Sequence, residues 1–292
     1  MKRRSAASLL VVSFWHLAET LLQTNPMARC KTGSARWAGW LLAAFCFPLA
    51  STAQVSFFGV DTNEVLWRIN ATTQTAVTIG NTGQFLEGLA LSPTGVLYGT
   101  DTGGVLYSLN TSTGAATLIG STGQGDIEGL HFSGSTLVGI SFSTVPTLFS
   151  INTATGATTN IVTLTSAVAG APRDLVITGN TALFTTFDSP DTLYSANLTT
   201  GTITLIGSMA VTPGQFLAMD FGSNGILYGF NGDGNVYSIN PANGGVTLLG
   251  NTGGQFWLDA TAVIPEPSTW ALMVLGAGLL MAPRPWRKRT RV

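Results

Sequence analysis

The chain has 292 residues, of which 45% are hydrophobic and 9% charged, and its formal net charge is −1. Charge is distributed unevenly, because residues 54–263 hold twelve acidic and two basic residues, a formal charge of −10. A segment this acidic has no basic face for nucleic acid or for an anionic membrane surface, so we expect neither as its partner. Both cysteines, Cys30 and Cys46, precede it, which excludes disulfides and thiolate metal sites from the segment.

The residues before position 54 show the organisation of an export signal twice. Residues 2–4 are basic and precede an apolar stretch, and a charged start, an apolar middle and a small-residue exit recur from Met27 to Ala53. This order is typical of a secretory signal peptide, with cleavage expected after Ala53. We predict that residues 1–53 form a signal region. A true start at Met27 and one long signal from Met1 both stay open, and both give the same mature chain.

Residues 54–263 repeat a five-residue motif whose consensus is Leu-Tyr-Ser-Ile-Asn. A turn containing Thr-Gly or Asn-Gly follows most copies, and the next strand ends near Ile-Gly or Leu-Gly. Four short strands in each period of about 40–45 residues are typical of a β-propeller blade. A propeller of another blade number and an irregular β-sandwich are the alternatives. The motif closes on Asn70, Asn110, Asn152, Asn197 and Asn240.

The order of the strands predicts the number of blades. If the innermost strand is A and the outermost is D, residues 55–80 supply B, C and D of one blade, and four complete A-B-C-D sets follow. A single A-type strand, residues 257–263, ends the segment and can complete the first blade, which hides the exposed sheet edges. We therefore predict an all-β, five-bladed β-propeller over residues 54–263, with antiparallel sheets and a last strand that closes the first blade.

The loop order also predicts an acidic face. The D–A and B–C loops of a propeller share one face, and they hold eleven of the twelve acidic residues of the segment, all except Asp220. Such a face would bind a cation or a basic surface, or would only keep the protein soluble. The eleven residues are Asp61, Glu64, Glu87, Asp101, Asp126, Glu128, Asp174, Asp188, Asp191, Asp233 and Asp259.

Four of these carboxylates are candidate metal ligands: Glu87, Glu128, Asp174 and Asp259. They start A strands, which line the central channel, so we expect them near its mouth. Neighbouring carboxylates repel one another, and a bound cation would relieve that repulsion. Ca²⁺ takes 6–8 oxygen ligands and would suit an irregular acidic mouth. The alternative is a solvated acidic rim that binds no ion. Apart from this candidate Ca²⁺, we expect no cofactor.

Glutamine recurs in the D–A loops, which suggests a ligand site. Side-chain amides beside aromatic rings form the kind of lining that carbohydrate sites use. The alternative is that duplicated blades keep loop residues that only make turns, with the aromatic residues in the core. The candidate ligand-binding residues are Gln84, Gln124, Gln215, Gln255 and Trp257.

The segment lacks the motifs of common enzyme classes. It has no Gly-x-Ser-x-Gly elbow, no histidine-based metal motif and no phosphate loop. Its one histidine, His131, lies in an apolar strand. We therefore expect no enzymatic activity. The alternative is a carbohydrate-active hydrolase or lyase that uses the carboxylates at the channel mouth.

The C-terminal residues 264–292 contain three features in a fixed order. Pro265, Glu266 and Pro267 come first, residues 268–282 are uncharged and mostly apolar, and a tail with four arginines and one lysine follows. An apolar stretch followed by clustered basic residues is a stop-transfer arrangement, although a full span needs about 17–25 residues. We therefore predict a short transmembrane segment suited to temporary anchoring.

This tail resembles the PEP-CTERM sorting signal of Gram-negative bacteria, which an exosortase recognises and processes. The resemblance implies an exported protein, anchored in the membrane through its C-terminal segment and then placed at the cell surface or outside the cell. It also implies an exosortase-type partner and a producer that makes exopolysaccharide. The repeats resemble those of loosely related exported propeller-like proteins, which implies the fold and no activity. We therefore predict a non-catalytic surface or extracellular-matrix protein that binds through its acidic face.

Overall fold

The structure is a computed structural model that describes residues 54–187, 190–209 and 216–263. The predicted signal region, Asp188, Gln215 and the predicted sorting signal at Pro265, Glu266 and Pro267 lie outside these residues. Within the described ranges, no helix is long and apolar enough to cross a membrane.

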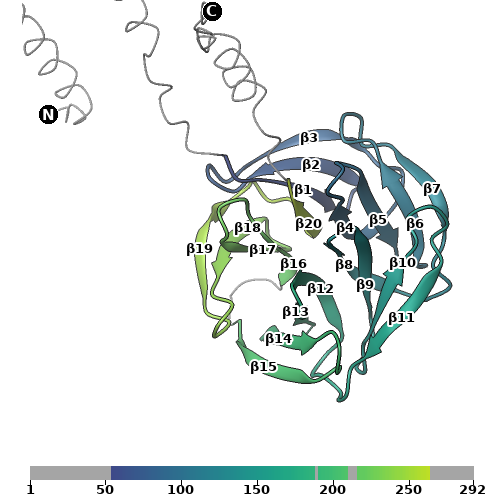
Figure 1. The fold of residues 1–292 in the computed structure, drawn as a ribbon. Coiled ribbons are helices and arrows are strands. Elements are labelled where there is room, and N and C mark those ends of the chain that lie inside the picture. Colours follow the sequence, from purple (N-terminus) through teal and green to yellow (C-terminus); the bar gives the residue numbers. More distant parts are fainter. Residues whose placement is uncertain (1–53, 188–189, 210–215, 264–292) are drawn as a thin grey trace, which may run out of the picture. The chain divides into compact units, whose positions relative to one another are not determined.

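The described residues form five antiparallel sheets of four strands each, arranged around a common axis (Figure 1). The strands are β1 (Ser56–Asp61), β2 (Val65–Asn70), β3 (Thr75–Asn81), β4 (Leu86–Leu91), β5 (Leu97–Asp101), β6 (Val105–Leu109), β7 (Ala116–Ser121), β8 (Ile127–Ser133), β9 (Thr136–Ser141), β10 (Thr147–Ile151), β11 (Thr158–Thr163), β12 (Pro172–Thr178), β13 (Thr181–Thr186), β14 (Thr192–Asn197), β15 (Ile203–Ser208), β16 (Phe216–Phe221), β17 (Leu227–Asn231), β18 (Asn235–Ile239), β19 (Val246–Asn251) and β20 (Trp257–Ala262).

The sheets are the blades of a closed ring. Blade 1 has the order β20-β1-β2-β3, and blades 2 to 5 follow in chain order from β4, β8, β12 and β16. Each innermost strand contacts the innermost strand of the next blade, and β20 contacts β4. The predicted all-β, five-bladed β-propeller is therefore confirmed.

The last strand closes the first blade, as the strand order predicts. Strand β20 pairs antiparallel with β1, with Phe57 opposite Ala262 and Gly59 opposite Ala260. The Val263 amide extends the pairing by donating a hydrogen bond to the Ser56 carbonyl at 2.8 Å. Blade 1 is thus built from both ends of the described segment, and β1 has a pairing partner on its inner edge.

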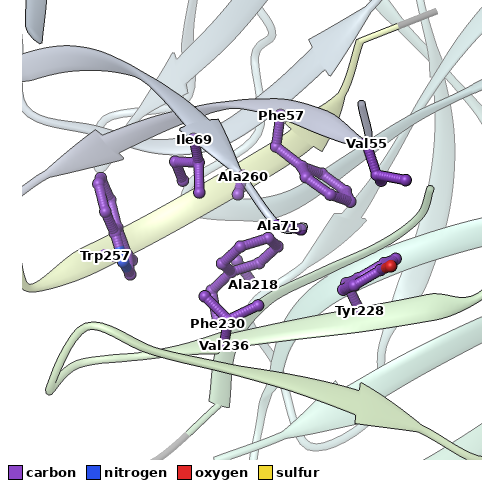
Figure 2. Packing of buried hydrophobic residues seen from close by; sticks show 10 residues of the cluster. All are labelled: Val55, Phe57, Ile69, Ala71, Ala218, Tyr228, Phe230, Val236, Trp257 and Ala260. Carbon is purple, nitrogen blue, oxygen red and sulfur yellow. The ribbon is translucent and has the colours of Figure 1, made fainter. Parts of the chain in front are cut away.

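Five buried hydrophobic clusters hold the ring together, one between each pair of neighbouring blades. Figure 2 shows the cluster that seals blade 5 against blade 1. There the Phe57 ring packs edge-on against Phe230 and Tyr228, with centroids 4.9 and 5.3 Å away, and Trp257 is fully buried. Burying a side chain of this size stabilises the fold by about 1.5–3 kcal/mol. Closure therefore rests on packing as well as on strand pairing.

The repeated motif serves these clusters on both sides of each blade. Its first residue packs toward the following blade, as Leu106 of blade 2 does toward blade 3. Its fourth residue packs toward the preceding blade, as Leu109 does toward blade 1. Residues three apart on a strand point to opposite faces, so one motif contributes to two cores. The first-position residues are Leu66, Leu106, Leu148, Leu193 and Val236, and the fourth-position residues are Ile69, Leu109, Ile151, Ala196 and Ile239.

The last residue of the motif and the glycines that follow it shape the outer strands. The Asn110 side-chain oxygen accepts hydrogen bonds from the amides of Ser112 and Thr113 at 2.9 and 3.0 Å, which fixes the C–D turn. Gly114 has a φ of 84°, and a Cβ there would lie 2.5 Å from the carbonyl oxygen of Gly80 in the preceding blade. The glycines of the repeat therefore let the outer strands of neighbouring blades touch.

Candidate functional site at the channel mouth

The structure places the B–C turns and the D–A loops on one face, as predicted. The two kinds of segment hydrogen-bond to each other within a blade. The Phe142 amide donates to the Asp126 carbonyl at 3.0 Å, and the Phe187 amide donates to the Ala171 carbonyl at 2.7 Å. We call this face the upper face; it carries the mouth that the sequence predicts to be acidic.

The inner strands bring three ionisable residues together at this mouth. The second residue of β4, β8 and β12 is Glu87, Glu128 and Arg173, respectively, so one charged side chain comes from each of three neighbouring blades. Asp126 precedes β8 and joins them, and oxygen atoms of Glu87, Asp126 and Glu128 lie within 4.8 Å of one another. We call these four residues the mouth cluster.

Arg173 is held in the mouth cluster by contacts with a carboxylate and two aromatic rings. Its Nη1 donates a hydrogen bond to the Oε2 atom of Glu128 at 2.7 Å, and the Glu128 side chain is only 4% exposed. The guanidinium carbon lies 4.3 Å from the ring centroid of Phe187 and 5.3 Å from that of Phe142. Two aromatic rings and a carboxylate therefore fix the orientation of the cation.

Burial dominates the electrostatics of the mouth cluster. Loss of hydration raises the pKa of Glu87 to about 7, with a further rise from the nearby Asp126 charge. Loss of hydration also raises the pKa of Glu128 to about 8, although the Arg173 charge acts in the opposite direction. The pKa of Asp126 is raised for the same reason. The cluster therefore holds protons that isolated carboxyl groups would release in weakly acidic solution.

The stability of the protein should fall as pH rises through this range. Both glutamates have a folded-state pKa above the ordinary 4.5, so their stabilising contribution is complete below about pH 4.5. It is lost as pH rises through about 7 for Glu87 and about 8 for Glu128. We expect the free energy of unfolding, measured by urea denaturation, to decrease between pH 5 and pH 9. Glu128→Gln, which keeps an acceptor for Arg173, should flatten the decrease, whereas Asp233→Asn on an exposed turn should not.

The other two predicted metal ligands form a separate pair deeper in the channel. Asp174 and Asp259 occupy the third position of β12 and β20, are fully buried, and hydrogen-bond to each other. Burial raises the pKa of both carboxyls well above the usual value, and for Asp259 the Asp174 charge adds to the rise. The two groups therefore share a proton.

Each of these aspartates also links its blade to the next one. Asp259 accepts a hydrogen bond from the Leu89 amide of blade 2, and Asp174 accepts one from the Met219 amide of blade 5. In blade 3 the third position is Gly129, where a Cβ would lie 2.7 Å from the Leu175 nitrogen. At this third position, neighbouring inner strands touch at a glycine in blades 2 and 3 and are bridged by an aspartate in blades 1 and 4.

Other carboxylates of the upper face fix turns. Asp61 accepts hydrogen bonds from the amides of Asn63 and Val65 at 2.9 and 3.0 Å, and from Trp67 Nε1 at 3.0 Å. Asp101 repeats the arrangement in the next blade, with the Tyr107 hydroxyl donating in place of the indole. These charges satisfy backbone groups of their own loops, so the acidic composition of the face overstates the charge that is free to meet a partner.

The predicted ligand-binding residues lie in different settings. Trp257 is fully buried and donates from Nε1 to the Thr252 hydroxyl at 3.1 Å. The Gln124 amide donates to the Thr158 hydroxyl of the next blade at 3.0 Å. Gln84 and Gln255 are half-buried, and Gln215 lies outside the described residues.

Sequence reasoning left Arg173 out of the candidate site and did not count Asp126 among the metal ligands. The sequence does contain features that could have identified Arg173 as a site residue. This arginine is one of two basic residues in an acidic segment, and it occupies the same strand position as Glu87 and Glu128. Asp126 is recognisable only in three dimensions, because it precedes its strand.

Fold and site together define the chain as a five-bladed β-propeller with a polar channel mouth flanked by aromatic rings. No family model matches the chain, and no curated protein matches its sequence.

Several solved structures are similar to the chain. One is a protein assigned as a 6-phosphogluconolactonase from Bacteroides fragilis, with 12% identity over 75% of this chain and 100% of that chain and a TM-score of 0.44. BamB from Moraxella catarrhalis has 16% identity over 68% of this chain and 59% of that chain, with a TM-score of 0.35. The WD40 β-propeller domain of Doa1 has 12% identity over 70% of this chain and 67% of that chain, with a TM-score of 0.39. These likenesses concern the fold alone and transfer no activity.

Proposed function

We propose that the protein is an exported, non-catalytic binding protein whose upper face binds a polysaccharide outside the cell. One observation carries the proposal: four phenylalanine side chains are exposed on that face, and two of them pack against Arg173 of the mouth cluster. Phe85 and Phe256 come from D–A loops, Phe142 and Phe187 come from B–C turns, and their exposed fractions are between 37% and 47%. Exposed aromatic rings stack on the apolar faces of sugar rings, and the polar groups between them can bond to hydroxyls.

The acidic residues that surround the mouth cluster on the upper face favour a neutral glycan. The described residues of the segment carry Arg68 and Arg173 as their only side-chain arginine or lysine cations, and Arg173 is already paired with Glu128. An acidic polysaccharide would meet a face of its own sign, which opposes association. We therefore expect a neutral chain, such as a glucan or galactan portion of an exopolysaccharide, as the ligand.

The hydrolase alternative needs a carboxyl group that reaches a glycosidic bond. Glu128 is 3% exposed and is bonded to Arg173, so a substrate has little access to it. Glu87 is half-buried, has a pKa raised to about 7 and could donate a proton. Turnover of a glycan that is lost in Glu87→Gln would replace the binding proposal with this alternative.

The binding test uses the purified protein and soluble neutral polysaccharides, including material from the producing bacterium, with affinity measured by calorimetry. We expect Phe142→Ala with Phe187→Ala to weaken binding about tenfold or more, because each lost stacking contact costs on the order of 1 kcal/mol. Leu205→Ala, which changes an exposed apolar residue of the outer strand β15, should leave affinity unchanged. Equal losses in both variants would contradict the assignment to the upper face.

The sorting part of the proposal rests on the C-terminal sequence features. If an exosortase-type enzyme processes the tail, the protein recovered from cells lacks the basic residues after position 283 and ends near Pro265, Glu266 and Pro267. The intact mass of the cell-derived product measures this directly. A mass that includes the basic tail would leave a membrane-anchored protein in place of a released one.

A further inference from the structure

A second opening of the channel lies on the lower face, opposite the mouth cluster, and it forms a cavity of about 450 Å³. The ends of the inner strands line it, and all five blades contribute. This volume is within the range of about 300–1,000 Å³ that small-molecule sites occupy. The lining residues that matter here are His131 and Phe132 from β8, Asp220 and Phe221 from β16, Ile177 from β12 and Thr261 from β20.

Asp220 supplies the charge of this cavity. Its Oδ2 atom accepts hydrogen bonds from the Ala262 amide at 2.7 Å and the Thr261 hydroxyl at 3.2 Å, and its Oδ1 atom accepts one from the Phe221 amide at 2.7 Å. Every partner is a donor, which is the pattern of an ionised carboxylate. These bonds fill three of about four acceptor positions, so Oδ1 keeps one position toward the cavity.

His131 fills that position only weakly. Its Nε2 atom lies 3.5 Å from the Asp220 Oδ1 atom, a long contact that a better-placed donor can replace. Its Nδ1 atom accepts a hydrogen bond from the Ile177 amide at 3.3 Å, so the ring is the neutral tautomer with its proton on Nε2. The imidazole therefore adds no positive charge, and the cavity keeps the single negative charge of Asp220.

The walls around this charge are apolar and aromatic. Phe132 and Phe221 line the cavity beside Ile177, and both rings are half-buried, so part of each remains accessible. Aromatic faces attract cations, and an apolar wall favours a ligand with a hydrophobic body. A cation with a hydrophobic body would satisfy both preferences and would also pair with the charge of Asp220.

We propose that the lower cavity binds a small organic cation, a primary ammonium group attached to an aryl or alkyl body. The ammonium donates a hydrogen bond to Asp220 Oδ1 in place of the long His131 contact, and the body packs against Phe132 and Phe221. This site is separate from the upper face, and it does not depend on glycan binding there.

Three isosteric probes test the sign of the charge preference. Calorimetry of the purified protein at pH 7.5 would compare 2-phenylethylammonium, 2-phenylethanol and phenylacetate. We expect the cation to bind about tenfold or more tightly than the neutral alcohol, and the anion to bind weakest. Equal affinity for the cation and the alcohol, tighter binding of the anion, or no binding of the cation at millimolar concentration would each overturn the proposal.

Two variants locate the site. Asp220→Asn should remove the preference for the cation over the alcohol, but it also alters bonds between blades and could impair folding. Thr178→Trp avoids that problem, because Thr178 is an exposed residue at the rim of the cavity, and the larger side chain should block entry. Thr62→Trp, at an exposed position on the upper face, is the matched control and should bind normally. Normal binding by Thr178→Trp would overturn the assignment to this cavity.

Discussion

Asp259→Ala should lower the free energy of unfolding by about 3–5 kcal/mol, the cost of breaking a buried, hydrogen-bonded pair. The substitution leaves the amides of Leu89 and Ala260 without their acceptor. It also removes the partner that shares a proton with Asp174. Each unsatisfied buried group costs about 1–3 kcal/mol, and Asp259 is 0% exposed, so the two amides are buried groups of this kind. Urea denaturation at pH 6 measures the loss.

Asp259→Asn is the conservative comparison. The two amides bond to different carboxyl oxygens of Asp259, so asparagine keeps an acceptor for only one of them, while its NH2 group can donate to an ionised Asp174. We therefore expect a smaller loss than for alanine, about 1–3 kcal/mol for the one unpaired amide. The pH dependence of stability should weaken at the same time, because the shared proton is gone. If the alanine variant were as stable as the asparagine variant, the bonds between blades 1 and 2 would not depend on this carboxyl.

Removal of strand β20 should abolish cooperative folding altogether. A chain that ends at residue 256 loses the innermost strand of blade 1, the buried Trp257 and the Asp259 bridge to blade 2. It also exposes the inner edge of β1 and the faces of β16 and β4 that β20 contacts. Near-ultraviolet circular dichroism and thermal unfolding should show no fixed tertiary structure and no single transition.

A chain that ends at residue 263 is the matched control, since it keeps every strand that the structure describes. Trp257→Ala gives an intermediate case, because it keeps the strand but empties its largest core position, at a cost of about 3–5 kcal/mol. The Trp67 ring, whose centroid lies 5.9 Å from that of Trp257, would lose its partner. A cooperative transition in the chain that ends at residue 256 would mean that four blades are sufficient for the fold.

The fold was largely predictable because four of the five blades are local. In blades 2 to 5, three hairpins join strands that are neighbours in the chain, so the repeat spacing and the single A-type strand at the end are sufficient to predict five closed blades. The placement of Trp257 in the core also has a sequence signal. The equivalent first positions of the other inner strands are Leu86, Ile127, Pro172 and Phe216, and all are apolar.

The chemistry of the channel was less predictable because it depends on contacts between blades. Nothing in the sequence near Asp174 identifies Asp259 or the Met219 amide as its partner. Likewise, the spacing of Glu87 and Glu128 does not show that Arg173 bonds to one of them and not the other. These pairings follow from the curvature of the ring, which decides which neighbouring side chains meet. A repeat pattern specifies the blades but not that curvature.

The closure of blade 1 has a consequence for the order of events in folding. Strands β1 and β20 are about 200 residues apart in the chain, and the entropic cost of bringing such distant segments together rises only slowly with their separation. Blades 2 to 5 need only neighbouring segments and can form first, but no intermediate can complete the ring before the last strand arrives. High contact order of this kind slows folding and leaves open sheet edges exposed in the meantime. The native ring therefore gains its protection against edge-to-edge association in its final step, and partially folded chains should be the species most prone to aggregate.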